Sequence, residues 1–442
     1  MNSARPQDQP GREAEAVRHS ETPALPAGKH VALGALFLLI VNLLIVARLF
    51  GVEYSAYTGS VEGTFLAIPR ILAKFPGQWR WWPFWNGGLP FECAYLPFTH
   101  WLTAGFILLT HLSAGRSYHI VSAAVYALGA PAFFWMAVEL SRRYTAGMIA
   151  ALTNSCLSFS ALLIPPITAD SGGPLILRRL QSLVFYAEAP HLTALVLLPV
   201  AIVCFSRAIE RGGVKWQLLA GVASAAMVLS NAFGVTVLPV ALICWLIAYP
   251  SRPWWRAPLQ AGITGLLVFC WVSPWLSPAL IRAIRANAAT TGGDFRYTPA
   301  SWILLAALAA AFIVLSAVLR RRRVPPYLTF VLLFGLVMTV VTVAGSVWNV
   351  SVIAQPGRYQ DEVDFIAPLI VIFTGALLLD RFPLQIRRAA VALAMIALTA
   401  QTVYTVHYAH RLIRRVDVKQ LSEYKLARWL EVCRQSVPNP MG

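Results

Sequence analysis

The chain has 442 residues, of which 58% are hydrophobic and 12% are charged, and its formal net charge is +17. This balance excludes a soluble globular protein and predicts an integral membrane protein. The Lys and Arg residues stand in short clusters between apolar runs, without a basic stripe or a reader motif. The positive charge therefore does not predict nucleic-acid binding.

The chain begins with a mixed-charge, proline-containing tail, residues 1–29, which we expect to be disordered and cytoplasmic. Between residues 30 and 407 there are about twelve apolar segments, and a spanning helix needs roughly 20 apolar residues. The candidate spans are 31–50, 97–113, 118–139, 145–163, 189–206, 217–230, 232–249, 259–281, 300–319, 326–347, 365–380 and 389–407. The sequence thus predicts an all-α polytopic transmembrane helical bundle of about 11–13 spans.

The run from Arg320 to Arg323 is the best landmark for sidedness, because basic residues near span ends stay on the cytoplasmic side. Alternation from this run places three polar loops outside: 164–188, 282–299 and 348–364. It also places residues 408–442 outside, where we expect a helical tail left from a truncated soluble domain. With the N-terminus inside, the number of crossings must be odd. The short segment 97–113 is therefore predicted to be re-entrant or interfacial.

The first loop, residues 51–96, is predicted to be external, since it is long and rich in the tryptophans that favour a headgroup interface. Residues 61–75 are expected to form a helix on the membrane surface, which Pro69 kinks or breaks. The candidate catalytic residues are the acids of this loop: Glu53, Glu62 and Glu92. Glu62 could act as a general base or help to hold a divalent metal such as Mg or Mn. The alternative is a first-turn glutamate that the helix dipole stabilises.

Two other external loops carry arginines that suit an anionic ligand. Arg358 follows a Pro-Gly turn and could grip a phosphate bidentately, or it could pair with Asp361 or Glu362 on its own loop. Arg178 and Arg179 are basic residues on the outer side, against the general trend.

Glu188 and His191 are three residues apart and share a helix face if the helix begins at residue 188. Glu-x-x-His can bind a metal, whereas a histidine at the mouth of a span more often caps or snorkels. The expected substrate-binding residues are Arg358, Tyr359, Arg178, Arg179, His191 and His100.

Three patches resemble a group of bacterial membrane proteins related to 6-pyruvoyl-tetrahydropterin synthase. They are YSAYTGSVEGT (54–64), WPFWNGGLP (82–90) and YLPFTH (95–100), and the PGRY sequence at 356–359 also fits. The similarity covers most of residues 30–430 and is strong at these patches. A single first span, a long external loop with an acid and then many spans resemble the wider GT-C superfamily of membrane glycosyltransferases.

This resemblance implies transfer of a sugar from a polyprenyl-phosphate donor to an acceptor at the outer face of the bacterial inner membrane. In that family an acid of the first external loop is the base or metal ligand, and a basic residue lies near the lipid phosphate. Glu62 and Arg358 would take these roles, with Arg178 or Arg179 assisting. The family pattern includes an aspartate in the loop, whereas this loop carries only glutamates.

The expected partners are the polyprenyl-phosphate sugar lipid, membrane lipids and an envelope-assembly partner. Two alternatives remain open. A transporter or flippase of lipid-linked precursors would carry charges deep within its spans, and few lie there. A non-catalytic scaffold in envelope assembly would account for the missing aspartate.

Overall fold

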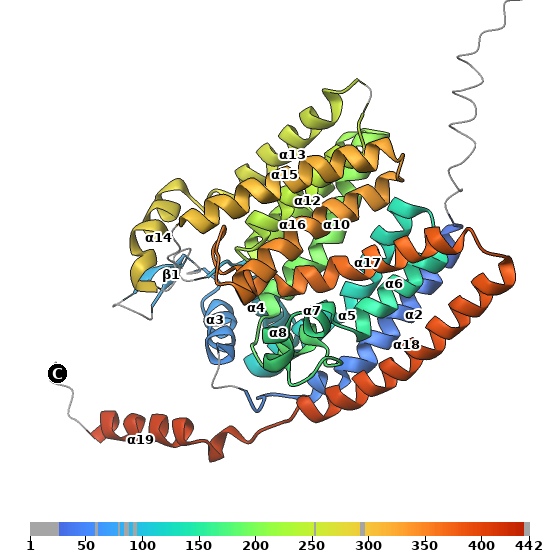
Figure 1. Cartoon of the computed structure of the whole chain (residues 1–442). Helices are drawn as coiled ribbons and strands as arrows, with labels where there is room; N and C mark the ends of the chain where they lie inside the picture. Colours follow the sequence, from blue (N-terminus) through green and yellow to red (C-terminus); the bar gives the residue numbers. More distant parts are fainter. Residues whose placement is uncertain are drawn as a thin grey trace, which may run out of the picture.

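The computed structural model describes residues 26–57, 61–77, 80–83, 88–91, 95–251, 253–291 and 297–436. These residues are almost entirely helical, which confirms the all-α prediction (Figure 1). Within them, the two strands are β1 (Trp81–Trp82) and β2 (Leu89–Pro90), which pair antiparallel with Trp82 opposite Leu89.

Among the described residues, seven helices are long and apolar enough to cross a membrane. They are α2 (Gly28–Val46) with η1 (Ala47–Gly51), α5 (Ala114–Ser141), α10 (Ala189–Arg211), α15 (Pro299–Arg321), α16 (Pro326–Val347), η3 (Pro356–Tyr359) with α17 (Gln360–Leu379), and α18 (Leu384–Leu412). Four shorter apolar helices accompany them: α4 (Phe98–Thr110), α11 (Val214–Ser230), α12 (Gly234–Ala248) and α13 (Arg256–Val272). The chain is therefore a multi-pass membrane protein.

Small residues let the central helices approach closely, as is usual where apolar burial alone cannot drive helix association. A Cβ added at Gly34 in α2 would lie 2.7 Å from the side chains of Met148 and Tyr144. A Cβ at Gly335 in α16 would collide with Ile370 of α17. The buried core consequently runs across α5, α10, α16 and α17.

One end of the bundle, which we call the basic face, carries arginines that pair with acids across helix ends. There Glu139 accepts from Arg207 at 2.9 and 3.0 Å, joining α5 to α10. Arg143 and Arg387 both pair with Asp380, at 2.7 and 3.1 Å, joining α18 and the start of α6 (Tyr144–Cys156) to the end of α17. These three arginines therefore lie at the same end of the bundle.

The opposite end, the polar face, carries the first loop and the C-terminal segment together. Ser55 forms a β-bridge with Arg415, and the backbone N–H of Ala56 donates to the carbonyl of Arg414 at 3.1 Å. This segment leads through η4 (Val418–Gln420) to α19 (Ser422–Ser436), which lies apart from the bundle (Figure 1). The first loop and the tail thus share one face.

The first loop contains α3 (Glu62–Lys74), whose apolar side packs inward while Arg70 and Lys74 are exposed. Of the two expected effects of Pro69, a kink or a break, the break does not occur, because the helix runs unbroken to Lys74. Burial of Phe65, Leu66, Ile68 and Leu72 holds the turns on both sides of the proline in place. Helix α3 is therefore stabilised by packing of its apolar side rather than by local helix propensity.

The segment predicted not to cross forms α4, whose 13 residues reach only about 20 Å. Immediately after it, Gly115 at the start of α5 packs against the backbone carbonyl of Glu53, on the polar face. Both ends of α4 thus lie on the face that carries the first loop. This arrangement agrees with an interfacial helix.

Cysteines placed at positions 70 and 116 test this arrangement, because both native side chains are exposed. In a background without the six native cysteines, a membrane-impermeant maleimide added from one side should label both positions. Labelling from opposite sides would show that α4 crosses the membrane.

The predicted span 145–163 is wrong as one helix, because it divides into α6 and the short α7 (Phe159–Leu163). The backbone is extended at Leu157 and Ser158. Here Ser158 Oγ accepts from the backbone N–H of Arg178 at 2.8 Å, and Ser160 binds Asp364. Similarly, the predicted span 259–281 ends at Val272, and α14 (Pro278–Thr291) follows separately.

Candidate functional site

A polar cleft of about 300 Å³ opens on the polar face, where the loops 164–188 and 348–359 meet. Its walls come from α8 (Pro165–Ser171), α9 (Arg178–Val184), the start of α10, η3 and the start of α17. The lining residues are Asp170, Arg178, Ser182, Tyr186, Glu188, His191, Gly357, Arg358, Gln360 and Asp361. Two loops that the sequence singled out separately therefore form one site.

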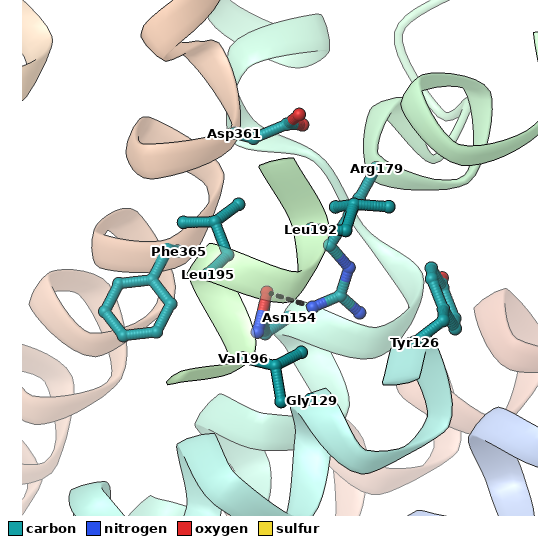
Figure 2. Close-up of a pocket in the computed structure, with 9 residues that line it drawn as sticks. All are labelled: Tyr126, Gly129, Asn154, Arg179, Leu192, Leu195, Val196, Asp361 and Phe365. Atoms are coloured by element: carbon teal, nitrogen blue, oxygen red, sulfur yellow. Dashed lines mark hydrogen bonds between the residues drawn. The ribbon is translucent and has the colours of Figure 1, made fainter. Parts of the chain in front are cut away.

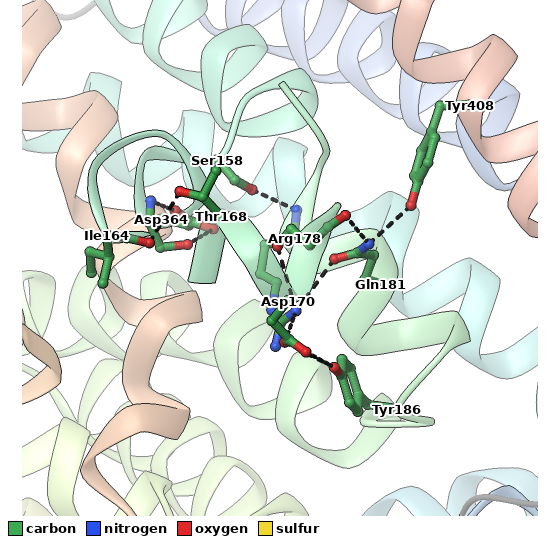
Figure 3. Close-up of polar contacts among 11 residues, drawn as sticks. Ser158, Ile164, Thr168, Asp170, Arg178, Gln181, Tyr186, Asp364 and Tyr408 are labelled. Carbon is green, nitrogen blue, oxygen red and sulfur yellow. Dashed lines mark hydrogen bonds and ion pairs between the residues drawn. The ribbon is translucent and has the colours of Figure 1, made fainter. Parts of the chain in front are cut away.

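Arg178 is the buried cation of this cleft, with 5% of its surface exposed. Figure 3 shows it at the centre of a network: Nη1 lies 2.5 Å from Asp170, and its backbone is held by Ser158. The amide of Gln360, with its oxygen turned toward Arg178, accepts from Nη2 at 3.0 Å and from Nε at 2.9 Å. The guanidinium is thus largely committed to protein partners, and it fixes α17 against α9.

Tyr186 covers Arg178, whose guanidinium carbon lies 4.8 Å from the ring centroid. The Tyr186 hydroxyl donates to Asp170 at 2.7 Å. Burial, followed by this hydrogen bond, raises the pKa of Tyr186, so the hydroxyl stays protonated and remains a donor.

Arg358 is the accessible cation of the cleft, since half of its side chain is exposed. Nη2 forms an ion pair with Glu188 Oε1, and Nη1 donates to Gln355 Oε1 at 3.0 Å. The guanidinium also lies over the ring of Phe233, 5.6 Å from its centroid. An exposed arginine with a single carboxylate partner can exchange that partner for an anionic ligand.

His191 lies at the base of the cleft and links two buried carboxylates of α17. Its Nε2 is 2.9 Å from Glu362 Oε1, and its Nδ1 is 4.0 Å from Asp361 Oδ2. Both acids are at most 2% exposed, although Asp361 reaches the cleft wall. Glu188 is more open than these two acids, with 14% of its side chain exposed, whereas Asp170, which pairs with Arg178, is 47% exposed.

Asp364, drawn in Figure 3, follows Asp361 by about one helical turn of α17. Its Oδ1 accepts from the backbone N–H of Ser160 at 2.6 Å, and its Oδ2 accepts from Ser160 Oγ at 2.9 Å. The contact ties α17 to α7 within the buried part of the protein.

Changing Asp364 to Leu should destabilise the protein by about 1–3 kcal/mol, because a buried backbone donor loses its acceptor. The midpoint of thermal unfolding in detergent measures the effect. Asp417→Ala is the control, since Asp417 is exposed in the C-terminal segment. Equal midpoints for the two variants would contradict the anchoring role of Asp364.

Arg179 points away from the cleft into a separate cavity of about 20 Å³ (Figure 2). It donates to Asn154 Oδ1 at 3.3 Å and lies over the ring of Tyr126, 4.9 Å from its centroid. Asp361 also lines this cavity, so one carboxylate lies between the Arg179 cavity and the cleft. The two adjacent arginines therefore have different surroundings.

Glu62 is buried at the start of α3, with 1% of its surface exposed. Ser55 Oγ donates to Oε2 at 2.5 Å, and His119 Nε2 lies 2.9 Å from Oε1. The adjoining cavity is only about 10 Å³, which is too small for a hydrated ion. The space beside Glu62 is therefore no larger than about one water molecule.

The Glu62 cavity and the polar cleft lie on either side of the turn that carries Glu188. Ala187 lines the first and Glu188 lines the second, and Tyr118 donates to the carbonyl of Ala187 at 3.1 Å. Ala187 has a positive φ of 55°, which is strained for a residue with a Cβ. Packing around Glu62 thus supports the turn that positions Glu188.

The remaining candidates lie outside the cleft. His100 is buried in α4 between the rings of Phe65 and Tyr95, and Tyr359 is buried against Phe233. Glu53 is partly buried where α5 begins. Glu92 lies outside the described residues. Among the described residues, no group of three or more His, Cys, Asp or Glu side chains is arranged to hold a metal ion.

The sequence prediction did not select Asp170, Glu188 or Asp361 as site residues, although it noted Glu188 beside His191 and Asp361 beside Arg358. The signal that could have found them is that both polar loops, 164–188 and 348–364, were predicted to lie on the same side of the membrane. Glu188 and His191, three residues apart, do line the same cleft.

Residues 175–277 match the model of the dolichyl-phosphate-mannose-protein mannosyltransferase family. This segment is less than half of the chain, and it contains Arg178, Glu188 and His191. The match supports the resemblance to GT-C enzymes at the level of the superfamily. The narrower group related to 6-pyruvoyl-tetrahydropterin synthase is not addressed by it.

Among solved structures, the chain is similar to ArnT from Cupriavidus metallidurans bound to undecaprenyl phosphate. The identity is 16% and the TM-score is 0.44, with 92% of this chain and 73% of that chain covered. No curated protein sequence matches the chain.

Proposed function

We propose that the chain is a membrane glycosyltransferase that takes a sugar from a polyprenyl-phosphate donor in the polar cleft. The observation that carries this proposal is the ion pair of Arg358 with Glu188, which places an exchangeable cation beside an accessible carboxylate. The family match supports it, since the matched family is named for a dolichyl-phosphate sugar donor and its segment forms one wall of the cleft.

Arg358 is the group that binds the donor phosphate. Phosphate oxygens can accept two parallel hydrogen bonds from a guanidinium, so the donor competes with Glu188 for Arg358. Arg178 is less suited to this role, because it is buried and already binds Asp170 and Gln360. Its positive charge still contributes to the attraction of an anion to the cleft.

Glu188 is the general base. Once the donor phosphate occupies Arg358, the released carboxylate accepts the proton of the acceptor hydroxyl. The acceptor oxygen then forms a bond to the anomeric carbon, and the bond from that carbon to the phosphate oxygen breaks. The electron pair of the broken bond stays on the phosphate, whose added charge Arg358 stabilises. Attack opposite the leaving group inverts the anomeric configuration.

His191 keeps the floor of the cleft in place through Glu362 and Asp361. Glu62 acts through the turn at Ala187 rather than on the substrate, since its oxygens face Ser55 and His119. Binding of Mg or Mn in the polar cleft is a separate proposal, which loss of transfer on chelation with recovery on addition of the ion would support.

The polar face is the outer side of a bacterial inner membrane under this proposal, because the basic face fits the cytoplasmic side. Lipid mass spectrometry of protein purified in mild detergent tests the donor class. A polyprenyl phosphate or its glycoside should co-purify with the wild-type chain. Its absence under conditions that retain other membrane lipids would contradict the donor class and favour a scaffold in envelope assembly.

A further inference from the structure

A second hollow, of about 770 Å³, lies on the basic face between α6, α17 and the start of α18. We call it the basic-face groove. Its walls are largely apolar and include Ile149, Val371 and Val391, together with small residues such as Gly375 and Ala390. A volume of this size falls in the range of roughly 300–1,000 Å³ typical of small-molecule sites.

Three arginines and one aspartate surround the mouth of this groove: Arg143, Arg387, Arg388 and Asp380. Asp380 pairs with Arg143 at 2.7 Å and with Arg387 at 3.1 Å. Arg388 is exposed and adds a further positive charge. The mouth therefore has an excess of positive charge even after the ion pairs are counted.

The groove is separate from the polar cleft. Gln360 and Asp361 at the start of α17 line the cleft, whereas Val371 to Leu379 line the groove. The 20 residues of α17 extend over roughly 30 Å, which is the thickness of a bilayer core. A headgroup bound at the arginines would consequently lie in the opposite leaflet from a donor bound at Arg358.

The groove exists because α18 packs against α2 and α6 but leaves the second half of α17 uncovered (Figure 1). In the membrane, acyl chains must occupy such a hollow. A basic mouth between membrane helices on the cytoplasmic side favours anionic over zwitterionic headgroups.

We propose that the basic-face groove is a binding site for one anionic phospholipid, with an acyl chain along α17 and its phosphate at Arg387 and Arg388. The lipid would fill the space between α17 and α18 and hold the two helices in register. This site does not depend on the proposed transferase function.

Gly375 offers a steric test, because a Cβ added there meets no atom within 4 Å. Gly375→Phe should therefore fold and fill the groove. Gly265→Phe is the matched control, since Gly265 in α13 is also open and lies outside the groove. For the headgroup, Arg387→Ala/Arg388→Ala removes two charges at the mouth, and Arg321→Ala/Arg322→Ala removes two from the arginine run outside it.

Native mass spectrometry of the full chain, delipidated and titrated with dioleoylphosphatidylglycerol or dioleoylphosphatidylethanolamine, measures the binding. The wild type and both controls should bind phosphatidylglycerol more tightly than phosphatidylethanolamine. The mouth variant should bind it about tenfold or more weakly, and Gly375→Phe should lose the preferred site.

Equal binding of the two lipids by the wild type would overturn the proposal, as would a Gly375→Phe chain that binds like its control. Conversion of an oligomer to a monomer by Gly375→Phe, without a change in lipid binding, would assign the groove to a second copy of the chain instead. Loss of polyprenyl phosphate rather than phosphatidylglycerol from the mouth variant would also contradict it.

Discussion

Replacing Glu188 by Gln should lower sugar transfer by about 10²- to 10⁴-fold, the usual contribution of a general base. The change keeps the size and shape of the side chain, but it removes both the base that accepts the acceptor's proton and the negative partner of Arg358. Transfer from a polyprenyl-phosphate sugar, followed in proteoliposomes, measures the loss. As a control for folding, the midpoint of thermal unfolding of the variant should lie within a few degrees of that of the wild type.

Two other acids provide controls for this result. Glu62→Gln should reduce transfer much less, since Glu62 faces Ser55 and His119 in a separate cavity. Asp361→Asn changes a carboxylate that lies at the cleft wall but is 2% exposed. Full activity of Glu188→Gln, with loss in either of the other variants, would assign the base to that other acid.

Replacing Arg358 by Ala should weaken donor binding by about 10- to 150-fold, which corresponds to roughly 1.5–3 kcal/mol for hydrogen bonds to a charged group. The cation is half exposed, so its removal does not leave a cavity in the core. Lipid mass spectrometry should show that the polyprenyl lipid bound to the wild type is lost from this variant.

Arg116→Ala is the matched control for Arg358, because it also removes an exposed arginine from the polar face, at the start of α5 and outside the cleft. It should retain the lipid. Retention by Arg358→Ala as well would place the phosphate elsewhere, and Arg178 would then be the next cation to test.

The fold was largely predictable from the sequence because apolar length and arginine placement are local signals. Ten of the twelve candidate segments correspond to single described helices, and the prediction from parity that α4 does not cross awaits the labelling test. The segment 145–163 failed because its break depends on distant residues. Ser158 and Ser160 leave the helical conformation to bind Arg178 and Asp364, and hydropathy contains no information about those contacts.

The site was predictable only in part. Arg178, His191 and Arg358 were selected because charge on an external loop is visible in a sequence, and the structure brings all three to one cleft. Which acid faces them depends on packing between helices far apart in the chain. Glu62 was selected as an acid of the first external loop, yet α3 packs inward and buries it beside His119.

The affinity of Glu188→Gln for a polyprenyl phosphate shows whether the donor phosphate and Glu188 compete for Arg358. Titration of the wild type and the variant, each in the same detergent, gives the two dissociation constants. If the two compete, the variant, which has lost the carboxylate, should bind the lipid more tightly although it no longer transfers the sugar. Weaker binding by Glu188→Gln would contradict the exchange of partners at Arg358.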